Sequence, residues 1–359
     1  MEATRTPGAR VWPNLLRAAV ARRRARTALR RIGWRIGPRR RWVAALAPEV
    51  VAARESNAGQ DWITEDVAVT DTAVMVAVVR CRTSGSRRVV KIPCTVEGAA
   101  GLRRQAQVLA ALHADVRLTD WLGVVPRPRA YGEVDGHSFW IEEAVPGTPV
   151  PERSMRAEAE AILAAAVSLI QGLHSRTAEH RTVGPTDIAE WIEWPLHRLA
   201  AFYATHSRPG RPQEALRRLA VELSGDLAHR TVRTSWVHGD FWTGNVLITG
   251  SAVTGIVDWD RAESDQLPLH DLLHLTVFAK RARDGGELGD IVLRSLHHGL
   301  AAATGVPAER LDGWLGGVPE RIAVLLFWLR HISLFIGSEG HGDNPDWIRR
   351  NVDSVLAQC

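Results

Sequence analysis

The sequence predicts an α+β protein in which a small β-rich part precedes a larger helical part. Three short runs of β-forming residues lie close together, at residues 67–69, 73–79 and 88–92. Farther along the chain, residues 185–230 and 285–359 have the pattern of helices. Because 45% of the 359 residues are apolar and no internal repeat is evident, we expect one bilobal domain or two small ones.

The β-rich part is expected to end in a hairpin. Residues 131–134 and 137–143 flank an Asp-Gly pair, which favours a tight turn. Between the third β-rich run and this hairpin, residues 101–112 predict a helix. After the hairpin, Ser154 can cap the next helix, whose apolar side chains recur at helical spacing.

Positive charge is concentrated at the start of the chain. Residues 1–59 hold 14 arginines and three glutamates, a net charge of +11, whereas the whole chain has +5, so the remainder has about −6. Gly33, Gly37 and Pro38 interrupt any long helix in this basic segment. We expect a solvated or body-packed extension. Contact with an anionic membrane surface stays open as an alternative, and nucleic acid is the least favoured partner.

Composition also sets the expected surroundings of the protein. Its three cysteines are widely spaced and odd in number, which argues against a disulfide framework and for a reducing compartment. No apolar run is long enough to span a bilayer, and the first residues lack the pattern of a signal peptide. We therefore expect a cytoplasmic protein, whose oligomeric state the sequence does not fix. The expected parts of the chain are the basic extension at 1–59, an N-terminal lobe at 60–147 and a C-terminal lobe at 148–359.

The densest group of chemically useful side chains surrounds a predicted strand-turn-strand unit. Two short apolar runs, 246–248 and 256–257, can pair as a hairpin across a Gly-Ser turn. The polar residues around this hairpin are His238, Asp240, Asn245 and Asp258. Phosphoryl transfer requires a carboxylate that positions the acceptor hydroxyl and hard oxygen ligands that hold magnesium. The group therefore outlines a phosphoryl-transfer site.

The same residues carry a resemblance to a known family. His238-Gly-Asp240, then four residues, then Asn245, and finally Ile256-Val-Asp258-Trp resemble the aminoglycoside phosphotransferase and choline kinase family, relatives of the protein kinases. The resemblance implies a bilobal protein-kinase-like fold, with a small β-rich N-terminal lobe and a larger helical C-terminal lobe. It also implies that Asp240 is the catalytic base and that His238 braces its loop. Asn245 and Asp258 would bind magnesium.

Two further acids follow this motif. Asp260 is a candidate supporting carboxylate, and a solvated turn residue is an equal alternative. Asp271 opens the next helix, and the resemblance implies that it hydrogen-bonds back to the catalytic loop. His270 and His274 flank it at the i, i+4 spacing of a zinc pair, but no third ligand stands at a matching position. We expect an ordinary, partly buried histidine pair.

The resemblance also assigns residues that bind the nucleotide. Lys91 lies on the third β-rich run, and Lys280 is the only other lysine in the chain. A compact ammonium fits between phosphate oxygens where arginine is not equivalent. The resemblance implies that Lys91 contacts the α and β phosphates of ATP. The segment from Glu143 to Val145 resembles the hinge between lobes, where backbone groups would meet adenine.

Two departures from the family pattern lie in the N-terminal lobe. Gln105 stands where the glutamate of the family would pair with Lys91, and Glu97 could substitute only if the helix begins before Gly98. If Gln105 faces the lysine, a glutamate there would be neutral or activating. The loop at residues 70–72 also has no glycine. These departures keep a nucleotide-binding pseudokinase or scaffold, tethered by the basic extension, as an alternative.

The expected function is ATP-dependent transfer of the γ-phosphate to a hydroxyl of a small molecule, with ATP and Mg²⁺ as cofactors. An antibiotic or another sugar-bearing natural product is the first acceptor class, which would imply antibiotic resistance. Amino alcohols and free sugars stay open. A metal-dependent hydrolase built on His238, Asp240 and Asp258 is a further alternative, against which Lys91 speaks. Aromatic and acidic candidates for the acceptor pocket are Glu190, Trp191, Glu193, Trp194, Trp242, Trp314, Trp328, Glu339, Asp343 and Trp347.

Overall fold

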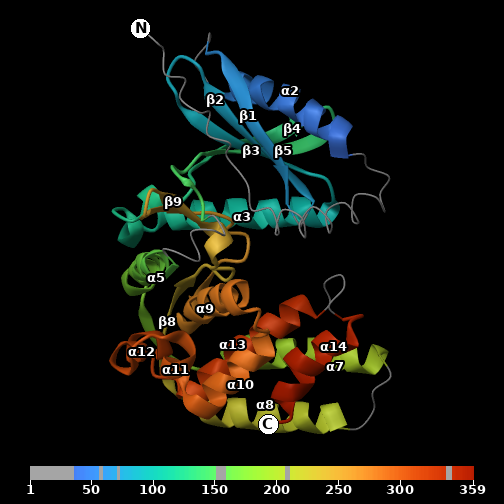
Figure 1. Ribbon diagram of the computed structural model, residues 1–359, viewed down its shortest axis with the longest axis vertical. Helices are drawn as coiled ribbons and strands as arrows, with labels where there is room; N and C mark the ends of the chain where they lie inside the picture. The colour runs from blue at the N-terminus through green and yellow to red at the C-terminus, as the bar shows by residue number, and fades with distance from the viewer. Residues whose placement is uncertain (1–35, 56–59, 71–72, 151–158, 207–210, 337–341) are drawn as a thin grey trace. The chain divides into compact units, whose positions relative to one another are not determined.

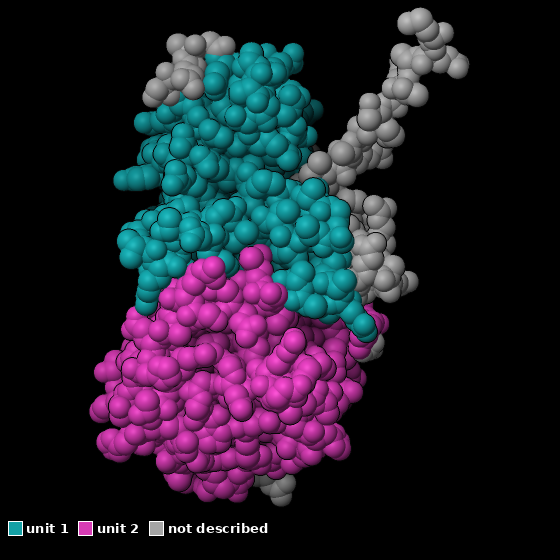
Figure 2. All heavy atoms as spheres, turned by 90° about the vertical axis from the view of Figure 1, so that its left-hand side faces the viewer, with its two compact units in different colours: residues 1–166, 244–262 teal, residues 167–243, 263–359 magenta. Residues whose placement is uncertain are grey.

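The chain forms two compact units, which Figure 2 colours separately. One comprises residues 1–166 and 244–262, and the other comprises residues 167–243 and 263–359. The computed structural model describes residues 36–55, 60–70, 73–150, 159–206, 211–336 and 342–359. Residues 1–35 of the basic extension, the proposed cap Ser154 and the acceptor candidate Glu339 lie outside these ranges.

The first unit is built on a five-stranded antiparallel sheet with the strand order β1-β2-β3-β5-β4 (Figure 1). Its strands are β1 (Trp62–Val69), β2 (Val74–Cys81), β3 (Arg87–Pro93), β4 (Pro128–Val134) and β5 (His137–Glu143). The three predicted β-rich runs lie in β1, β2 and β3. The predicted hairpin is formed by β4 and β5, and both residues of its Asp-Gly turn have positive φ angles.

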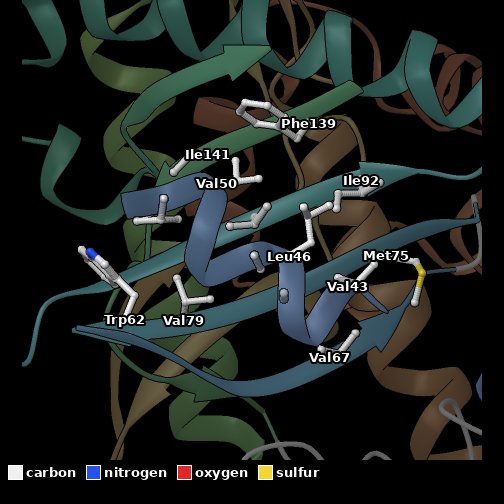
Figure 3. Packing of buried hydrophobic residues seen from close by; sticks show 14 of the residues in the cluster. Val43, Leu46, Val50, Trp62, Val67, Met75, Val79, Ile92, Phe139 and Ile141 are labelled. Carbon is white, nitrogen blue, oxygen red and sulfur yellow. The ribbon is translucent and has the colours of Figure 1, made fainter. Parts of the chain in front are cut away.

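Helix α2 (Ile36–Arg54) packs on this sheet. Its buried apolar side chains recur three and four positions apart, at Val43, Leu46, Ala47, Val50 and Val51. They join side chains of β1, β2, β3 and β5 in one hydrophobic cluster (Figure 3). The later part of the predicted basic extension therefore belongs to the core of this unit. Gly37 and Pro38, which were expected to interrupt a helix, lie in its first turn, where a proline removes no needed donor.

A proline inside α2 explains one bond between the helix and the sheet. Because Pro48 has no N–H, the carbonyl of Ala44 cannot receive its usual helical hydrogen bond. The hydroxyl of Thr64 on β1 donates to this carbonyl at 2.6 Å. The bond satisfies the carbonyl and ties α2 to the edge strand of the sheet.

Helix α3 (Val96–Ala114) begins earlier than the predicted start at residue 101. Thr95 caps it, because the Thr95 hydroxyl accepts the N–H of Gly98 at 3.0 Å. Two short 3₁₀ turns, η1 (Val116–Leu118) and η2 (Leu122–Val124), follow α3. A three-stranded sheet of order β10-β9-β6 completes the unit, with β6 (Thr148–Pro149), β9 (Val246–Thr249) and β10 (Ala252–Ile256). Strands β9 and β10 form the predicted hairpin, but the second strand begins at Ala252 rather than at residue 256 and ends before Val257.

The second unit is mostly helical and contains a three-stranded sheet of order β11-β8-β7. Its strands are β7 (Glu179–Thr182), β8 (Thr231–Val237) and β11 (Glu263–Gln266). The division between the units falls within α5 (Ala159–Arg176) and within the 3₁₀ turn η4 (Thr243–Asn245). The other helices are α6 (Pro185–Ile188), η3 (Ala189–Glu193), α7 (Trp194–Thr205), α8 (Arg211–Leu227), α9 (Leu269–Asp284), α10 (Leu288–His298), α11 (Leu300–Thr304), α12 (Ala308–Leu315), α13 (Glu320–Phe335), α14 (Pro345–Ile348), η5 (Arg349–Asp353) and α15 (Ser354–Leu356).

The predicted α+β class is confirmed, with a β-rich N-terminal sheet and a helical C-terminal part. Helix α13 forms much of the core of the second unit, since most of its apolar side chains are buried. In the described part of the chain, no helix is both long and apolar enough to cross a membrane.

Candidate functional site

The loop that follows β8 carries His238, Gly239 and Asp240, and a buried carboxylate holds its backbone. Asp271, in the first turn of α9, accepts the N–H of His238 at 2.8 Å and the N–H of Gly239 at 2.9 Å. His174 donates to the same carboxylate through Nε2 at 3.0 Å. Gly239 has a φ of +74°, a conformation that favours glycine. Two bonds to the Asp271 side chain therefore fix the loop, and His174 holds the same carboxylate in place.

Asp271 is fully buried, and its charge is stabilised locally. Burial alone would raise its pKa, but the hydrogen bond and charge of His174, followed by the charge of His238 and its backbone N–H, hold the pKa of Asp271 below its usual value. The carboxylate is therefore ionised at neutral pH. An anion that accepts backbone N–H groups is the strongest type of anchor for such a loop.

Asp240 follows this anchored turn with its side chain partly accessible. Its backbone N–H lies 3.4 Å from Nδ1 of the buried His238, which links the imidazole to the loop. Its carboxylate oxygen Oδ1 lies 3.6 Å from Nε2 of His274, and 23% of its side chain is exposed. The candidate catalytic carboxylate can therefore be reached from solvent while its backbone is held in place.

In the first unit, the β9-β10 hairpin brings the two candidate metal ligands to the same end. Val246 pairs with Ile256, and the N–H of Val257 donates to the carbonyl of Asn245 at 2.9 Å. Asn245 therefore lies opposite the residue that precedes Asp258. Asp258 has a φ of +71°, an uncommon conformation for a residue other than glycine, although Asp and Asn adopt it more readily than most. Uncommon backbone conformations of this kind concentrate at functional sites.

The residues after Asp258 fix the turn and add a second negative charge. The indole of Trp259 is completely buried, donates to the carbonyl of Ile256 at 2.9 Å and packs edge-on against Trp121. Burial, and then the charge of Asp258, raise the pKa of Asp260 to about 6, against the opposing effect of nearby cations that include Lys91. Two carboxylates thus compete for the positive charge available at this end of the hairpin.

Lys91 on β3 forms a buried ion pair with a residue that sequence reasoning did not select. Its Nζ lies 2.5 Å from Oε1 of Glu142 on β5. Gln105 on α3 donates to the other carboxylate oxygen of Glu142 at 2.9 Å. The prediction that Gln105 or Glu97 would pair with Lys91 is wrong, since Glu97 is exposed at the start of α3 and Gln105 contacts the carboxylate instead.

The charge of Lys91 depends on these acids. Burial would lower its pKa, but the charges of Glu142 and Asp258, the hydrogen bond to Glu142 and the charge of Asp260 hold the pKa of Lys91 above its usual value. Within the first unit, the ammonium of Lys91 therefore interacts electrostatically with Asp258, one of the two candidate metal ligands. The sequence signal for Glu142 is weak, because β5 ends in two adjacent glutamates, Glu142 and Glu143, a pattern that is also compatible with an exposed strand end.

The hinge-like segment is held on both sides. The N–H of Glu143 donates to the carbonyl of Arg127 at 2.9 Å, so this group is already used, and the Glu143 side chain pairs with Arg129 at 3.3 Å. Val145 packs closely over Gly255, where an added Cβ would come within 2.2 Å of the valine side chain. The backbone near Val145 therefore lies directly against β10, and the proposed adenine contacts of Glu143 cannot include its N–H.

The second unit contains a pocket of about 230 Å³. Side chains that line it include Glu190, Trp191, Trp194, Gln266, His270 and Arg330. Of the acceptor candidates, Glu190, Trp191 and Trp194 are therefore in this pocket. Trp314 and Trp328 are instead in the core.

Charged side chains of the pocket bond to one another. Arg330 pairs with Glu263 at 2.8 Å and donates to Gln266 at 3.2 Å. Gln266 in turn donates to Glu190 at 3.3 Å. Burial, and then the charges of Glu263 and Asp187, raise the pKa of Glu190. The pocket thus combines indole faces with two acids, Glu190 and Glu263, and two arginines, Arg198 and Arg330.

The two histidines of the pair on α9 lie in different environments. His270 lines the pocket, whereas His274 lies beside Asp240. Among the described residues, no three or more His, Cys, Asp or Glu side chains are grouped as a metal site. The glycine-poor loop at residues 70–72 is only partly described, since residues 71–72 lie outside the described ranges. Thr70 accepts the N–H of Val74 through its hydroxyl at 3.1 Å.

Comparisons with known proteins identify the family and the fold. The model of the phosphotransferase enzyme family, APH, matches residues 76–309. Two structures of a thermostable mutant of aminoglycoside phosphotransferase APH(4)-Ia, both ternary complexes with AMP-PNP and hygromycin B, match with TM-scores of 0.52 and 0.51 at 14% and 15% identity. The matches cover 88% and 86% of this chain and 98% and 97% of those chains.

One further structure is aminoglycoside phosphotransferase APH(3'')-Id from Streptomyces rimosus, with 20% identity, a TM-score of 0.44, and coverage of 79% of this chain and 98% of its own. A search of curated protein sequences found no match. At identities this low, the likeness to the two APH(4)-Ia structures, which have TM-scores above 0.5, establishes a shared fold.

Proposed function

Because the chain belongs to the phosphotransferase enzyme family, we propose that it transfers the γ-phosphate of ATP to a hydroxyl group of a small molecule. The observation that carries this proposal is the loop after β8. A buried, ionised Asp271 holds the backbone of His238 and Gly239, and the partly accessible carboxylate of Asp240 follows directly. A fixed, accessible carboxylate is what positioning and deprotonating an acceptor hydroxyl requires.

Magnesium fits the donor set of the first unit. Asn245 and Asp258 offer an amide oxygen and a carboxylate oxygen at the same end of one hairpin, and magnesium prefers such hard oxygen ligands. The neighbouring Asp260 adds negative charge that a cation would offset. In this proposal Asn245 and Asp258 hold magnesium, which when bound neutralises charge on the nucleotide phosphates. Lys91 contributes a compact cation for the same phosphates.

A sugar-bearing, positively charged acceptor suits the pocket of the second unit. Indole faces such as those of Trp191 and Trp194 pack well against sugar rings and organic cations. The pKa of Glu190 is raised by partial desolvation and then by the charges of Glu263 and Asp187, and an ammonium group beside it would relieve that repulsion. Structures with this fold hold hygromycin B and a nucleotide analogue, which supports an aminoglycoside-like antibiotic as the first acceptor to test.

The decisive experiment incubates the protein with magnesium-ATP and a panel of aminoglycosides, free sugars and amino alcohols, and measures an added phosphate by mass. Asp240→Asn should lower turnover by about two orders of magnitude or more and leave nucleotide binding intact, because it removes the base and keeps its shape. The matched control is Asp346→Asn, at an exposed acid that pairs with exposed Arg349.

Three outcomes would contradict the proposal. Normal turnover in Asp240→Asn would remove this residue from the mechanism. Tight nucleotide binding without a phosphorylated product from any acceptor class would favour the pseudokinase alternative. Cleavage of a test compound without ATP would favour the metal-dependent hydrolase.

A further inference from the structure

Three buried polar side chains of the first unit, from β3, α3 and β5, contact one another. Lys91, Gln105 and Glu142 are 8%, 3% and 7% exposed. The ammonium of Lys91 contacts Oε1 of Glu142, and the amide of Gln105 donates to Oε2. Both oxygens of the carboxylate are therefore engaged, one by a cation and one by a neutral donor.

The sheet register explains why Glu142 reaches the lysine. Strands β3 and β5 are antiparallel neighbours in which Lys91 pairs with Trp140. Glu142 is two residues beyond Trp140, so it lies on the same face as Lys91, at the diagonal position of the ladder. Long side chains can meet across this diagonal. The ion pair is thus built into two hydrogen-bonded strands of one sheet.

The residue on α3 complements this arrangement. Because Glu142 already supplies the negative charge, a donor is needed at position 105, and the glutamine amide provides it at 2.9 Å. A carboxylate at the same place would put two buried anions within contact distance of each other, with one ammonium between them. Gln105 therefore supplies the hydrogen-bond donor that Glu142 requires, and its lack of charge is not a defect of the site.

We propose that Glu142 is the positioning residue of Lys91. The anionic partner of the lysine lies on β5 instead of at position 105 on α3, where the family resemblance places it, so residues 105 and 142 form a reciprocal Gln-Glu pair. This proposal rests on the proposed function in one respect, namely that Lys91 meets the nucleotide phosphates. It adds that the orientation of the lysine depends on the carboxylate of Glu142 and on which of the two positions carries the charge.

The test compares Glu142→Gln, Gln105→Glu and the double variant that exchanges both residues. Affinity for magnesium-AMP-PNP is measured by calorimetry, KM for ATP and kcat by kinetics, and folding by thermal unfolding. Glu142→Gln should raise Kd and KM for the nucleotide at least about tenfold, since a hydrogen-bonded charge partner is removed. Gln105→Glu should lower the unfolding midpoint. The double variant should recover nucleotide affinity to within about threefold, because one cation, one anion and one amide are again present.

Control variants separate this proposal from the proposed function. Glu133→Gln, on exposed strand β4 of the same unit, makes the same chemical change and should leave Kd unchanged. Lys91→Met tests the lysine itself: normal nucleotide affinity in that variant would overturn the phosphate role of Lys91. If Lys91→Met is defective and Glu142→Gln binds nucleotide within about twofold of the unaltered protein, the positioning role of Glu142 is refuted alone.

The exchange also keeps the test decisive when a single variant folds poorly. A double variant that is folded and restores affinity supports the reciprocal pair even if Glu142→Gln unfolds. A double variant no better than its worse single parent would refute the exchange, because a packing role for residues 105 and 142 predicts additive damage.

Discussion

Replacing Asp271 by asparagine tests whether one buried carboxylate holds the candidate catalytic loop. Asp271→Asn keeps the shape of the side chain but leaves a single acceptor oxygen for three donors, the N–H groups of His238 and Gly239 and Nε2 of His174. In one amide orientation the bond to Gly239 is lost. In the other, the bonds to His174 and His238 are lost. In either orientation, the amide N–H₂ group faces a buried donor.

The magnitude follows from the number of bonds. A hydrogen bond to a charged group contributes about 1.5–3 kcal/mol, and a buried donor left unpaired costs about 1–3 kcal/mol. The variant loses at least one such bond and the charge that strengthens the others, so we expect a loss of about 2–4 kcal/mol in the free energy of unfolding. Since the pKa of Asp271 lies below the usual 3.8, the native side chain contributes its full effect above that pH, and the loss should be constant from pH 5 to pH 8.

The assays are urea unfolding, followed by tryptophan fluorescence, and phosphotransferase kinetics. Because Asp240 follows the released turn, turnover should fall by one to two orders of magnitude, as displacements of about 1 Å cost in positioned reactions. The matched control Asp346→Asn should change stability by less than about 0.5 kcal/mol, since its exposed ion pair contributes little. A change below about 1 kcal/mol in Asp271→Asn, with normal turnover, would refute the anchoring role.

Three further outcomes are expected. Asp258→Asn, which keeps a residue type that tolerates the positive φ, should weaken binding of magnesium-ATP far more than of metal-free ATP in calorimetric titrations; equal effects would indicate a packing role. Burial, and then the charge of Arg330, lower the pKa of His270 to about 3, against 6.5 in the unfolded chain. The unfolded chain therefore takes up a proton that the folded chain does not, and the free energy of unfolding should fall by about 2 kcal/mol from pH 7.5 to pH 5. In urea unfolding, His270→Gln should abolish this part of the loss, and an unchanged pH profile would contradict the argument. Deleting residues 1–35, which hold ten arginines and one glutamate, should remove any low-salt binding to anionic vesicles and preserve the midpoint of unfolding. Deleting residues 1–54 should lower the midpoint of unfolding, because it also removes α2. Vesicle binding that survives the shorter deletion would place the contact elsewhere.

Local sequence patterns predicted the parts of the fold that local chemistry determines. The Gly-Ser turn and the apolar runs around it identified the β9-β10 hairpin, and the Asp-Gly pair identified the β4-β5 turn. The family resemblance carried by the motif from His238 to Asp258 is confirmed by the family match. In both cases the signal lies within a few consecutive residues, where turn geometry and alternation leave few alternatives.

The long-range pairings could not be predicted in the same way. The partner of Lys91 depends on the register between β3 and β5, which are separated in sequence by α3 and β4. The prediction that a glutamate at position 105 would be neutral or activating is conditional on contact with Lys91, and Gln105 contacts Glu142 instead. The packing of α2 depends on a sheet that the helix precedes in sequence, so its arginines were more conspicuous than its apolar stripe.

The near absence of lysine turns the buried ammonium into a chemical reporter. Amine-acylating reagents have two lysine side chains to modify in this chain, and Lys91 is buried, paired with Glu142 and kept protonated, which makes it a poor nucleophile. Lys280 is more accessible, and after proteolysis its peptide is distinguished from that of Lys91 by mass. The ratio of acylation at the two lysines therefore reads out directly whether the ion pair has opened, with the second lysine as an internal standard in the same molecule.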